Sequence, residues 1–170
     1  MTILNSKFNK KILTIFGLAI ILGFMLGLRR EQETVDITAI DSIIHWEILK
    51  EIILNNTIAF LLLCCSLIIG KSIIYMFFSI NGFLIGTVIG RVRNITAIIL
   101  LIPHGILEMG SFLFAGAILY HLLSENEKGV IVLEKKKYLN LFLISYFTLT
   151  FSALIEVFIT PQLVVWVETF

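Results

Sequence analysis

The sequence predicts an all-α, polytopic membrane helical bundle with about five transmembrane helices and a short interfacial or re-entrant segment before Pro103. Of its 170 residues, 58% are hydrophobic and 15% are charged, and the mean hydropathy is +1.00. Soluble domains carry roughly 25% charged residues. The apolar residues form five runs of about 17–25 residues, the length at which a helix crosses a bilayer. The lipid bilayer is therefore the first expected partner.

The five runs divide a single membrane domain, residues 1–170, into spans and connections. In the segment at about 38–51, isoleucines recur at helical spacing with charged residues between them, and Trp46 is present. We therefore expect an amphipathic interfacial helix there. The spans are expected at about 12–28, 52–69, 72–90, 104–123 and 139–159.

The stretch at 95–102 is apolar but too short to cross a membrane alone, and Pro103 follows it. Proline fits best at the first position of a helix, where its missing N–H is not needed. We therefore expect a separate segment that lies at the interface or re-enters the membrane; one long kinked helix is the alternative.

Basic residues predict the orientation, because loops on the cytoplasmic side carry more Lys and Arg. With five spans, eight of the 13 Lys and Arg residues fall on the side of the N-terminus and five on the other. The expected location is the plasma membrane, with a cytoplasmic N-terminus.

Small residues repeat at four-residue spacing in two of the predicted spans. Gly23 and Gly27 form one such pair, and Gly82, Gly86 and Gly90 form a longer stripe. Glycines at this spacing let another helix approach closely.

The most unusual stretch begins Pro103-His104-Gly105 and continues to Glu108, the single charged residue between 95 and 123. A charged side chain at the centre of a bilayer costs roughly 2.5–3.5 kcal/mol by insertion scales. If this stretch is helical, positions 104 and 108 are one turn apart and share a face.

The expected topology also places six polar residues in the same half of the bilayer, by parity the outer half. They are Asn55, Asn56, Asn81, His104, Glu108 and Glu156. Three interpretations stay open: a sealed hydrogen-bonded network, a site facing an outer cavity that binds or guides a substrate or proton, and a metal-dependent hydrolase.

Other chemistry has little support in the sequence. There is no Gly-rich phosphate loop, no Ser-His-Asp or Cys-His pattern, and no basic stripe for nucleic acid, while Cys64 and Cys65 are adjacent and unsuited to a structural disulfide. We therefore expect no catalytic residue, no metal, no cofactor and no enzymatic activity.

Several of these residues together resemble the stage II sporulation protein M family of small multi-pass membrane proteins. The resemblance covers roughly residues 51–162. It rests on Asn55-Asn56, on Asn81-Gly82 with Gly86, on Pro103-His104-Gly105 with Glu108, on Ala115-Gly116, and on Glu156 with Thr160-Pro161.

The resemblance implies two kinds of role. Founding members act in engulfment during endospore formation, in a membrane complex with peptidoglycan-degrading partners. Short relatives accompany an ATP-binding protein in circular bacteriocin clusters and serve maturation, export or self-protection.

Our leading hypothesis is a non-enzymatic subunit of a membrane complex that handles a peptide or bacteriocin with a separate ATPase. A homo-oligomer of the chain is a further expected assembly. Lys71 and the basic loop at 128–137 are candidate docking surfaces for that partner, although ordinary positive-inside anchoring explains them more simply. The second hypothesis is a scaffold for cell-wall remodelling in sporulation with a wall hydrolase. The third is an intramembrane metal-dependent hydrolase.

Overall fold

Helices account for nearly all of the chain that the computed structural model describes, which is residues 6–29, 42–92, 95–127, 135–160 and 162. Side chains are described for these residues except 6–9, 42–45, 95–104 and 135–137. In chain order the helices are α1 (Ser6–Gly27), α2 (Ser42–Cys64), α3 (Ser66–Ile69), α4 (Lys71–Val92), α5 (Ile95–Glu127) and α6 (Lys135–Phe158).

Five stretches of these helices are long and apolar enough to cross a membrane. They confirm the predicted all-α architecture with five spans. The stretches are Lys10–Gly27, Trp46–Ile69, Lys71–Val92, Gly105–Glu127 and Tyr138–Phe158.

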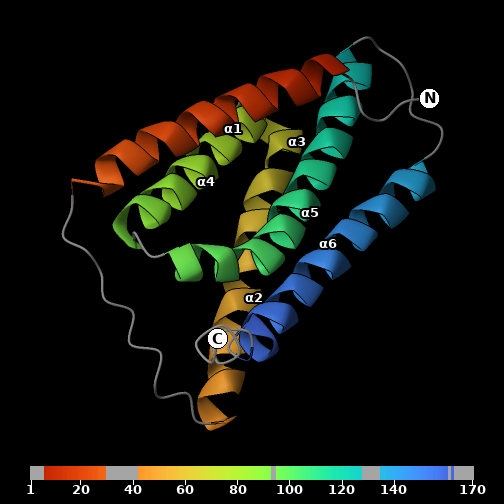
Figure 1. The fold of residues 1–170 in the computed structure, drawn as a ribbon. Coiled ribbons are helices and arrows are strands. Elements are labelled where there is room, and N and C mark those ends of the chain that lie inside the picture. The colour runs from red at the N-terminus through yellow and green to blue at the C-terminus, as the bar shows by residue number, and fades with distance from the viewer. Residues whose placement is uncertain (1–5, 30–41, 93–94, 128–134, 161, 163–170) are drawn as a thin grey trace.

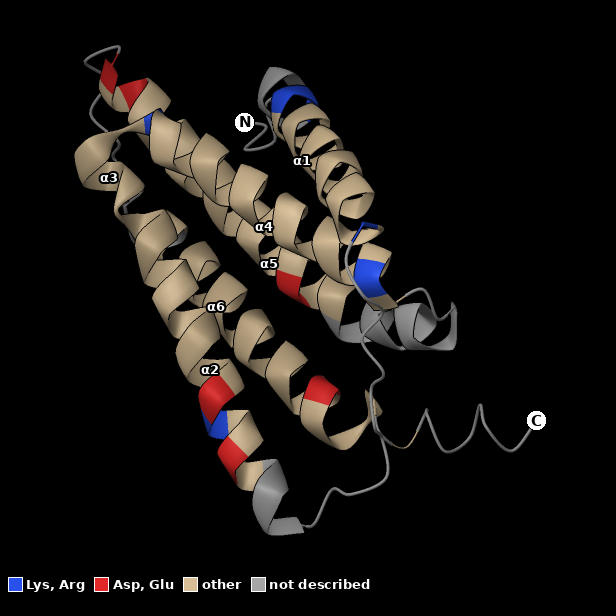
Figure 2. Cartoon of the chain, turned by 90° about the vertical axis from the view of Figure 1, so that its left-hand side faces the viewer, with Lys and Arg blue, Asp and Glu red and all other residues tan. Residues whose placement is uncertain are grey.

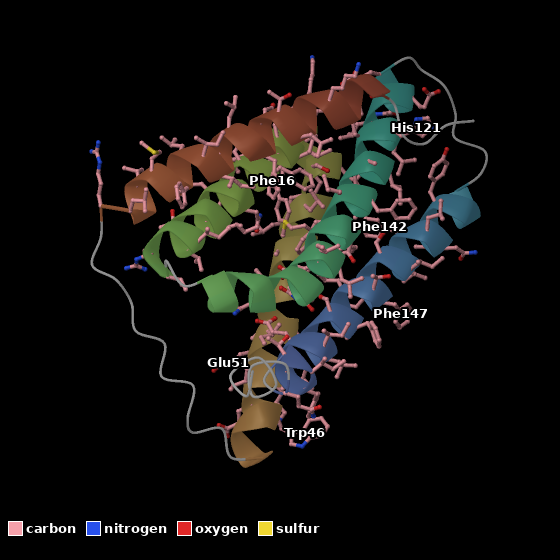
Figure 3. The ribbon with its side chains drawn as sticks, viewed as in Figure 1. Phe16, Trp46, Glu51, His121, Phe142 and Phe147 are labelled. Carbon is pink, nitrogen blue, oxygen red and sulfur yellow. The ribbon has the colours of Figure 1, made fainter. Side chains whose placement is uncertain are left out.

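The outer surface of the bundle is apolar, as a lipid-facing surface must be. Large apolar side chains such as Leu18, Leu84 and Phe147 are exposed, and Figure 3 shows Phe147 on the outer side of α6. Figure 2 shows charged residues mainly near the ends of the helices, apart from an acidic position partway along α5.

Helix α1 packs chiefly on α4, and Figure 1 shows the two side by side. The two helices run in the same direction, since Phe16 lies against Gly82 and Phe24 lies against Gly90 further along both. Both predicted glycine stripes lie in this contact. A Cβ on Gly82 would be 2.7 Å from the Phe16 carbonyl oxygen, and one on Gly27 would be 3.1 Å from the Gly90 Cα. The backbones therefore touch, as the glycine spacing predicts.

The turn between the second and third spans is very short. Helix α2 ends at Cys64, the single turn of α3 follows, and Gly70 alone separates α3 from α4. Gly70 has φ = 111° and ψ = −176°, a conformation that is essentially open to glycine alone. Its N–H donates to the Ser66 carbonyl at 2.7 Å. This residue therefore allows the reversal.

The segment before Pro103 differs from our first expectation. Residues 95–127 form one helix, and Figure 1 shows its first turns running across the molecule before the helix changes direction. Proline kinks a helix by removing one backbone hydrogen bond and crowding the preceding turn. The alternative of one long bent helix therefore describes the backbone, while the depth of residues 95–102 in the membrane stays a prediction.

The predicted interfacial helix at 38–51 lies only partly in the described chain, because residues 30–41 are outside it. Residues 42–51 are the first turns of α2 and continue into the span without a break. Trp46 is exposed near the start of α2, with its ring 5.6 Å from that of Phe158 near the end of α6. The interfacial location of this segment also stays a prediction.

Candidate functional site: a polar layer beneath an aromatic layer

Three phenylalanine rings from three helices meet in the middle of the bundle. The Phe112 ring on α5 lies 4.9 Å from Phe77 on α4 and 6.5 Å from Phe60 on α2, measured between ring centroids. From α6, the rings of Phe142 and Tyr146 lie 4.6 and 5.3 Å from Phe60. We call these five residues the aromatic layer.

Each of the three phenylalanines has a polar residue one helical turn away. Asn56 precedes Phe60 by four residues, Asn81 follows Phe77 by four, and Glu108 precedes Phe112 by four. Residues four apart in a helix lie on the same face. These three residues are the polar layer.

The three polar residues lie on the same side of the aromatic layer. Helix α4 runs opposite to α5, because Lys71 at the start of α4 pairs with Glu127 at the end of α5. Helix α2 runs with α5, because Phe60 meets Phe112 and, further along, Cys64 lines the same cavity as Ile118. The residues one turn before Phe60 and Phe112 therefore lie toward the same end of the bundle as the residue one turn after Phe77.

The members of the polar layer differ in their hydrogen bonds. The Asn81 amide nitrogen donates to the Phe77 carbonyl at 2.8 Å. The Asn56 amide nitrogen is buried and has no hydrogen-bond partner. Leaving a buried donor unsatisfied costs about 1–3 kcal/mol. Asn56 is therefore the polar group of the layer that is best placed to bind something.

Glu156 adds a second carboxyl to this end of the bundle. It follows the buried Leu149 by seven residues and therefore lies on the same face of α6, two turns further on. Glu108 and Glu156 are both half-buried, and their carboxyl groups interact electrostatically across α5 and α6. Two neighbouring carboxyls in an apolar setting favour a cationic or hydrogen-bond-donating partner.

Of the other two predicted residues, Asn55 does not join this layer and the His104 side chain lies outside the described part of the structure. Asn55 is exposed on the outer side of α2, because one residue along a helix turns the side chain by about 100° away from Asn56. His104 is in the continuous helix α5, one turn before Glu108, but its side chain lies outside the described residues.

The remaining motif residues mostly serve packing. Ala115 is fully buried, and a Cβ on Gly116 would be 3.0 Å from the Phe78 ring, so this pair lets α4 approach α5. The Thr160 hydroxyl donates to the Ile155 carbonyl at 3.3 Å just past the end of α6. Gly105 has open space around it, Pro103 is within α5, and Pro161 lies outside the described residues.

Comparison with known proteins identifies the family of this chain. A family model described as stage II sporulation protein M matches residues 12–161. The chain belongs to this family. A protein of the archaeon Methanocaldococcus jannaschii, named uncharacterized protein MJ0793, is 32% identical in an alignment over 130 residues that covers 68% of this chain and 71% of that protein. No solved structure matches the chain.

The matched region of this stage II sporulation protein M family member includes the polar layer, Asn55, His104 and Glu156. Among the side chains that the structure describes, no three His, Cys, Asp or Glu residues come together as a metal site would require. That set does not include His104, so the metal interpretation is untested.

One candidate docking residue is engaged within the bundle. The Lys71 ammonium pairs with the Glu127 carboxylate and lies 4.9 Å from the centroid of the Tyr120 ring. Lys71 is thus less available to a partner than an unpaired lysine. Residues 128–134 and the side chains of 135–137 lie outside the described part.

The aromatic layer and the bond between Thr57 and Tyr146 did not figure in the sequence prediction. The Thr57 and Tyr146 hydroxyl oxygens are 2.9 Å apart and join α2 to α6 beside Asn56. The sequence does contain a signal for the layer, namely a phenylalanine four residues from each of Asn56, Asn81 and Glu108.

Proposed function

We propose that this protein is a non-enzymatic subunit of a membrane complex that handles a peptide, such as a bacteriocin, together with a separate ATP-binding protein. The observation that carries the proposal is the polar layer, in which a buried amide without a partner and a half-buried carboxyl lie in an otherwise apolar bundle. A peptide carries the complementary groups, since its backbone offers carbonyl acceptors and N–H donors and its amines offer positive charge.

The aromatic layer favours a role in which this chain binds and guides a peptide, and it argues against transport of the peptide through this chain alone. Rings from α2, α4, α5 and α6 pack against each other directly above the polar layer. A peptide that entered the bundle from the end nearer to the polar layer would reach the polar layer first. The aromatic rings would then block its path to the opposite end of the bundle. The sequence also contains no phosphate-binding loop, so the energy for movement would come from a partner.

Asn55 supports membership of a complex. Its amide is exposed on α2 among the exposed side chains of Leu54, Ile58 and Leu62, within a predicted span. A polar side chain that faces lipid is costly, whereas one that faces a neighbouring helix forms an interhelical hydrogen bond. We therefore assign this face of α2 to a transmembrane helix of another subunit.

The role of the polar layer is tested by Glu108→Gln. The variant keeps the size and hydrogen-bonding capacity of the side chain but cannot carry a negative charge. We expect it to fold and to lose most peptide-handling activity, measured as peptide in the medium or as protection of the producing cells. Glu51→Gln, an exposed glutamate of α2, is the matched control. Full activity of Glu108→Gln would show that Glu108 is only a structural hydrogen-bonding group.

The complex itself is tested by affinity purification of the full chain from its own host in mild detergent, followed by mass spectrometry. We expect an ATP-binding protein in stoichiometric amount, and we expect Asn55→Leu to lose it. Asn140→Leu makes the same change at an exposed position of α6 and should retain the partner. If the wild-type chain brings no ATP-binding protein, the transport-linked role is wrong.

A second candidate function is a membrane scaffold for cell-wall remodelling during sporulation. The description of the matching family, stage II sporulation protein M, favours it. The same purification separates the two roles, because a scaffold of this kind would bring down a peptidoglycan hydrolase in place of the ATP-binding protein.

A further inference from the structure

A second feature with binding potential lies on the other side of the aromatic layer. There, α2, α3, α5 and α6 surround an open cavity of about 320 Å³. Its walls include Cys64, Leu67, Leu119, Leu122, Tyr138 and Phe142. The volume is at the lower end of the roughly 300–1,000 Å³ typical of ligand sites, and an apolar lining of this kind does not hold water well.

The cavity lies close to where the helices leave the predicted membrane region. Tyr138 is the first residue of the last candidate span, and Leu122 is in the last turns of the fourth span, which ends at Glu127. Leu67 lies two residues before the end of the second span at Ile69. An apolar cavity at this depth is within reach of the acyl chains of the surrounding lipid.

This end of the bundle is also rich in basic residues. Helix α6 begins with three consecutive lysines directly before Tyr138, whereas Lys71 at the start of α4 is already paired with Glu127. By the count of Lys and Arg, it is the side predicted to face the cytoplasm. Basic sites between transmembrane helices on that side bind anionic lipid head groups.

One polar atom beside the cavity lacks a partner. The Nε2 atom of His121 is buried without a hydrogen bond, and the His121 ring lies 5.7 Å from the ring of Tyr138, which lines the cavity. Figure 3 shows His121 near the end of α5 and Phe142 of α6 in the region between α5 and α6. A phosphate or ester oxygen of a lipid would accept a hydrogen bond from this nitrogen.

We infer that the cavity is a binding site for an anionic phospholipid. One acyl chain fills the space between α2, α5 and α6, and the head group lies at the basic end beside His121. Lipid is the occupant because the cavity opens within the predicted membrane-spanning region, is apolar inside, and lies next to the start of α6, where the sequence has three consecutive lysines. This site is independent of the proposed peptide function, which concerns the opposite end of the bundle.

The test uses the full chain in nanodiscs that contain equal amounts of phosphatidylglycerol and phosphatidylcholine with identical oleoyl chains. Native mass spectrometry after release from the disc counts the lipids that stay bound. We expect the wild-type chain to retain one phosphatidylglycerol molecule in preference to phosphatidylcholine. Equal retention of the two lipids, or retention of neither, would overturn the proposal.

Two variants place the lipid in the cavity. Leu122→Trp fills space inside it and should weaken retention by roughly tenfold or more, since a single methylene in an apolar pocket already changes affinity by roughly 10–200-fold. Leu84→Trp, on the exposed side of α4, is the matched control and should retain lipid normally. Unchanged retention by Leu122→Trp would refute the location.

His121→Phe keeps an aromatic ring beside Tyr138 and removes the ring nitrogens. We expect the variant to bind lipid still but to prefer phosphatidylglycerol less strongly. An unchanged preference would show that His121 does not contact the head group, and the assignment of that residue would then be wrong.

Discussion

The contact between α1 and α4 gives the sharpest stability prediction, through the substitution Gly86→Ala. A Cβ at this position would collide with the carbonyl group and Cα of Ile20. These are backbone atoms, so no side chain can move aside and the two helices must separate. Overpacking costs typically about 1–3 kcal/mol. The higher helix propensity of alanine offsets this cost by roughly 0.5–1 kcal/mol of folding free energy, because glycine loses more conformational entropy than alanine when the helix forms.

We therefore expect a net loss of about 0.5–2 kcal/mol for Gly86→Ala, which lowers the ratio of folded to unfolded protein by roughly 2–30-fold. Gly23→Ala makes the same change from the α1 side, where the added Cβ would collide with the backbone of Phe83. It should be destabilising to a similar degree.

Gly17→Ala on the same helix is the control. Its Cβ would meet nothing within 4 Å, so only the gain in helix propensity of about 0.5–1 kcal/mol remains. The assay is equilibrium unfolding of the purified protein in mixed micelles with increasing SDS, followed by far-UV circular dichroism. If Gly86→Ala and Gly23→Ala are as stable as the wild type, or are stabilised like Gly17→Ala, then α1 and α4 are not in backbone contact and the packing described above is wrong.

Three further predictions use the same unfolding assay. Gly70→Ala should cost about 1–3 kcal/mol, since Gly70 has a backbone conformation that alanine rarely adopts; wild-type stability would mean that the turn has another conformation. Phe112→Ala should cost about 3–5 kcal/mol, because this fully buried ring contacts two others; a loss below about 1 kcal/mol would contradict its central position. Tyr146→Phe and Thr57→Val should each cost roughly 0.6–2 kcal/mol, and the double variant should lose no more than either alone; additive losses would show that the two hydroxyls are not bonded.

The five spans could be predicted because hydrophobic length is a strong and local signal in the sequence. The close contact of the glycine stripes also followed from local spacing, although the sequence did not say that α1 would meet α4. That pairing depends on which helices become neighbours, and a single sequence contains no direct record of it. The packing of Gly23 and Gly27 against the stripe on α4 was therefore visible only in the structure.

The path of the chain at Pro103 could not be decided from the sequence. In water, a proline within a helix usually ends it, because the freed carbonyl groups bond to solvent. In a membrane there is no solvent to take them, and neighbouring groups satisfy them while the helix continues with a bend. The same residue therefore has opposite meanings in the two environments, and here the helix continues.

The two adjacent asparagines show a similar limit. Both Asn55 and Asn56 were expected in one polar cluster, yet Asn56 lies one turn from Phe60 on the inner face and Asn55 is exposed. Which of two neighbours points inward depends on the rotation of α2, and the contacts of Phe60 with Phe112 and Phe142 determine that rotation. A rotation of about 100° would exchange the two roles.

The aromatic layer gives the two halves of the bundle different chemistry. Toward one end lie Asn56, Asn81 and Glu108, with Glu156 beyond them; toward the other lies an apolar cavity next to the lysine-rich start of α6. A polar substrate would be stabilised only in the first half, and lipid only in the second. Under the proposed peptide-handling function, we therefore expect that a peptide does not pass through the middle of these helices. It would pass along an interface with another subunit, and the exposed amide of Asn55, at the depth of the polar layer, marks the face of α2 where we place that interface.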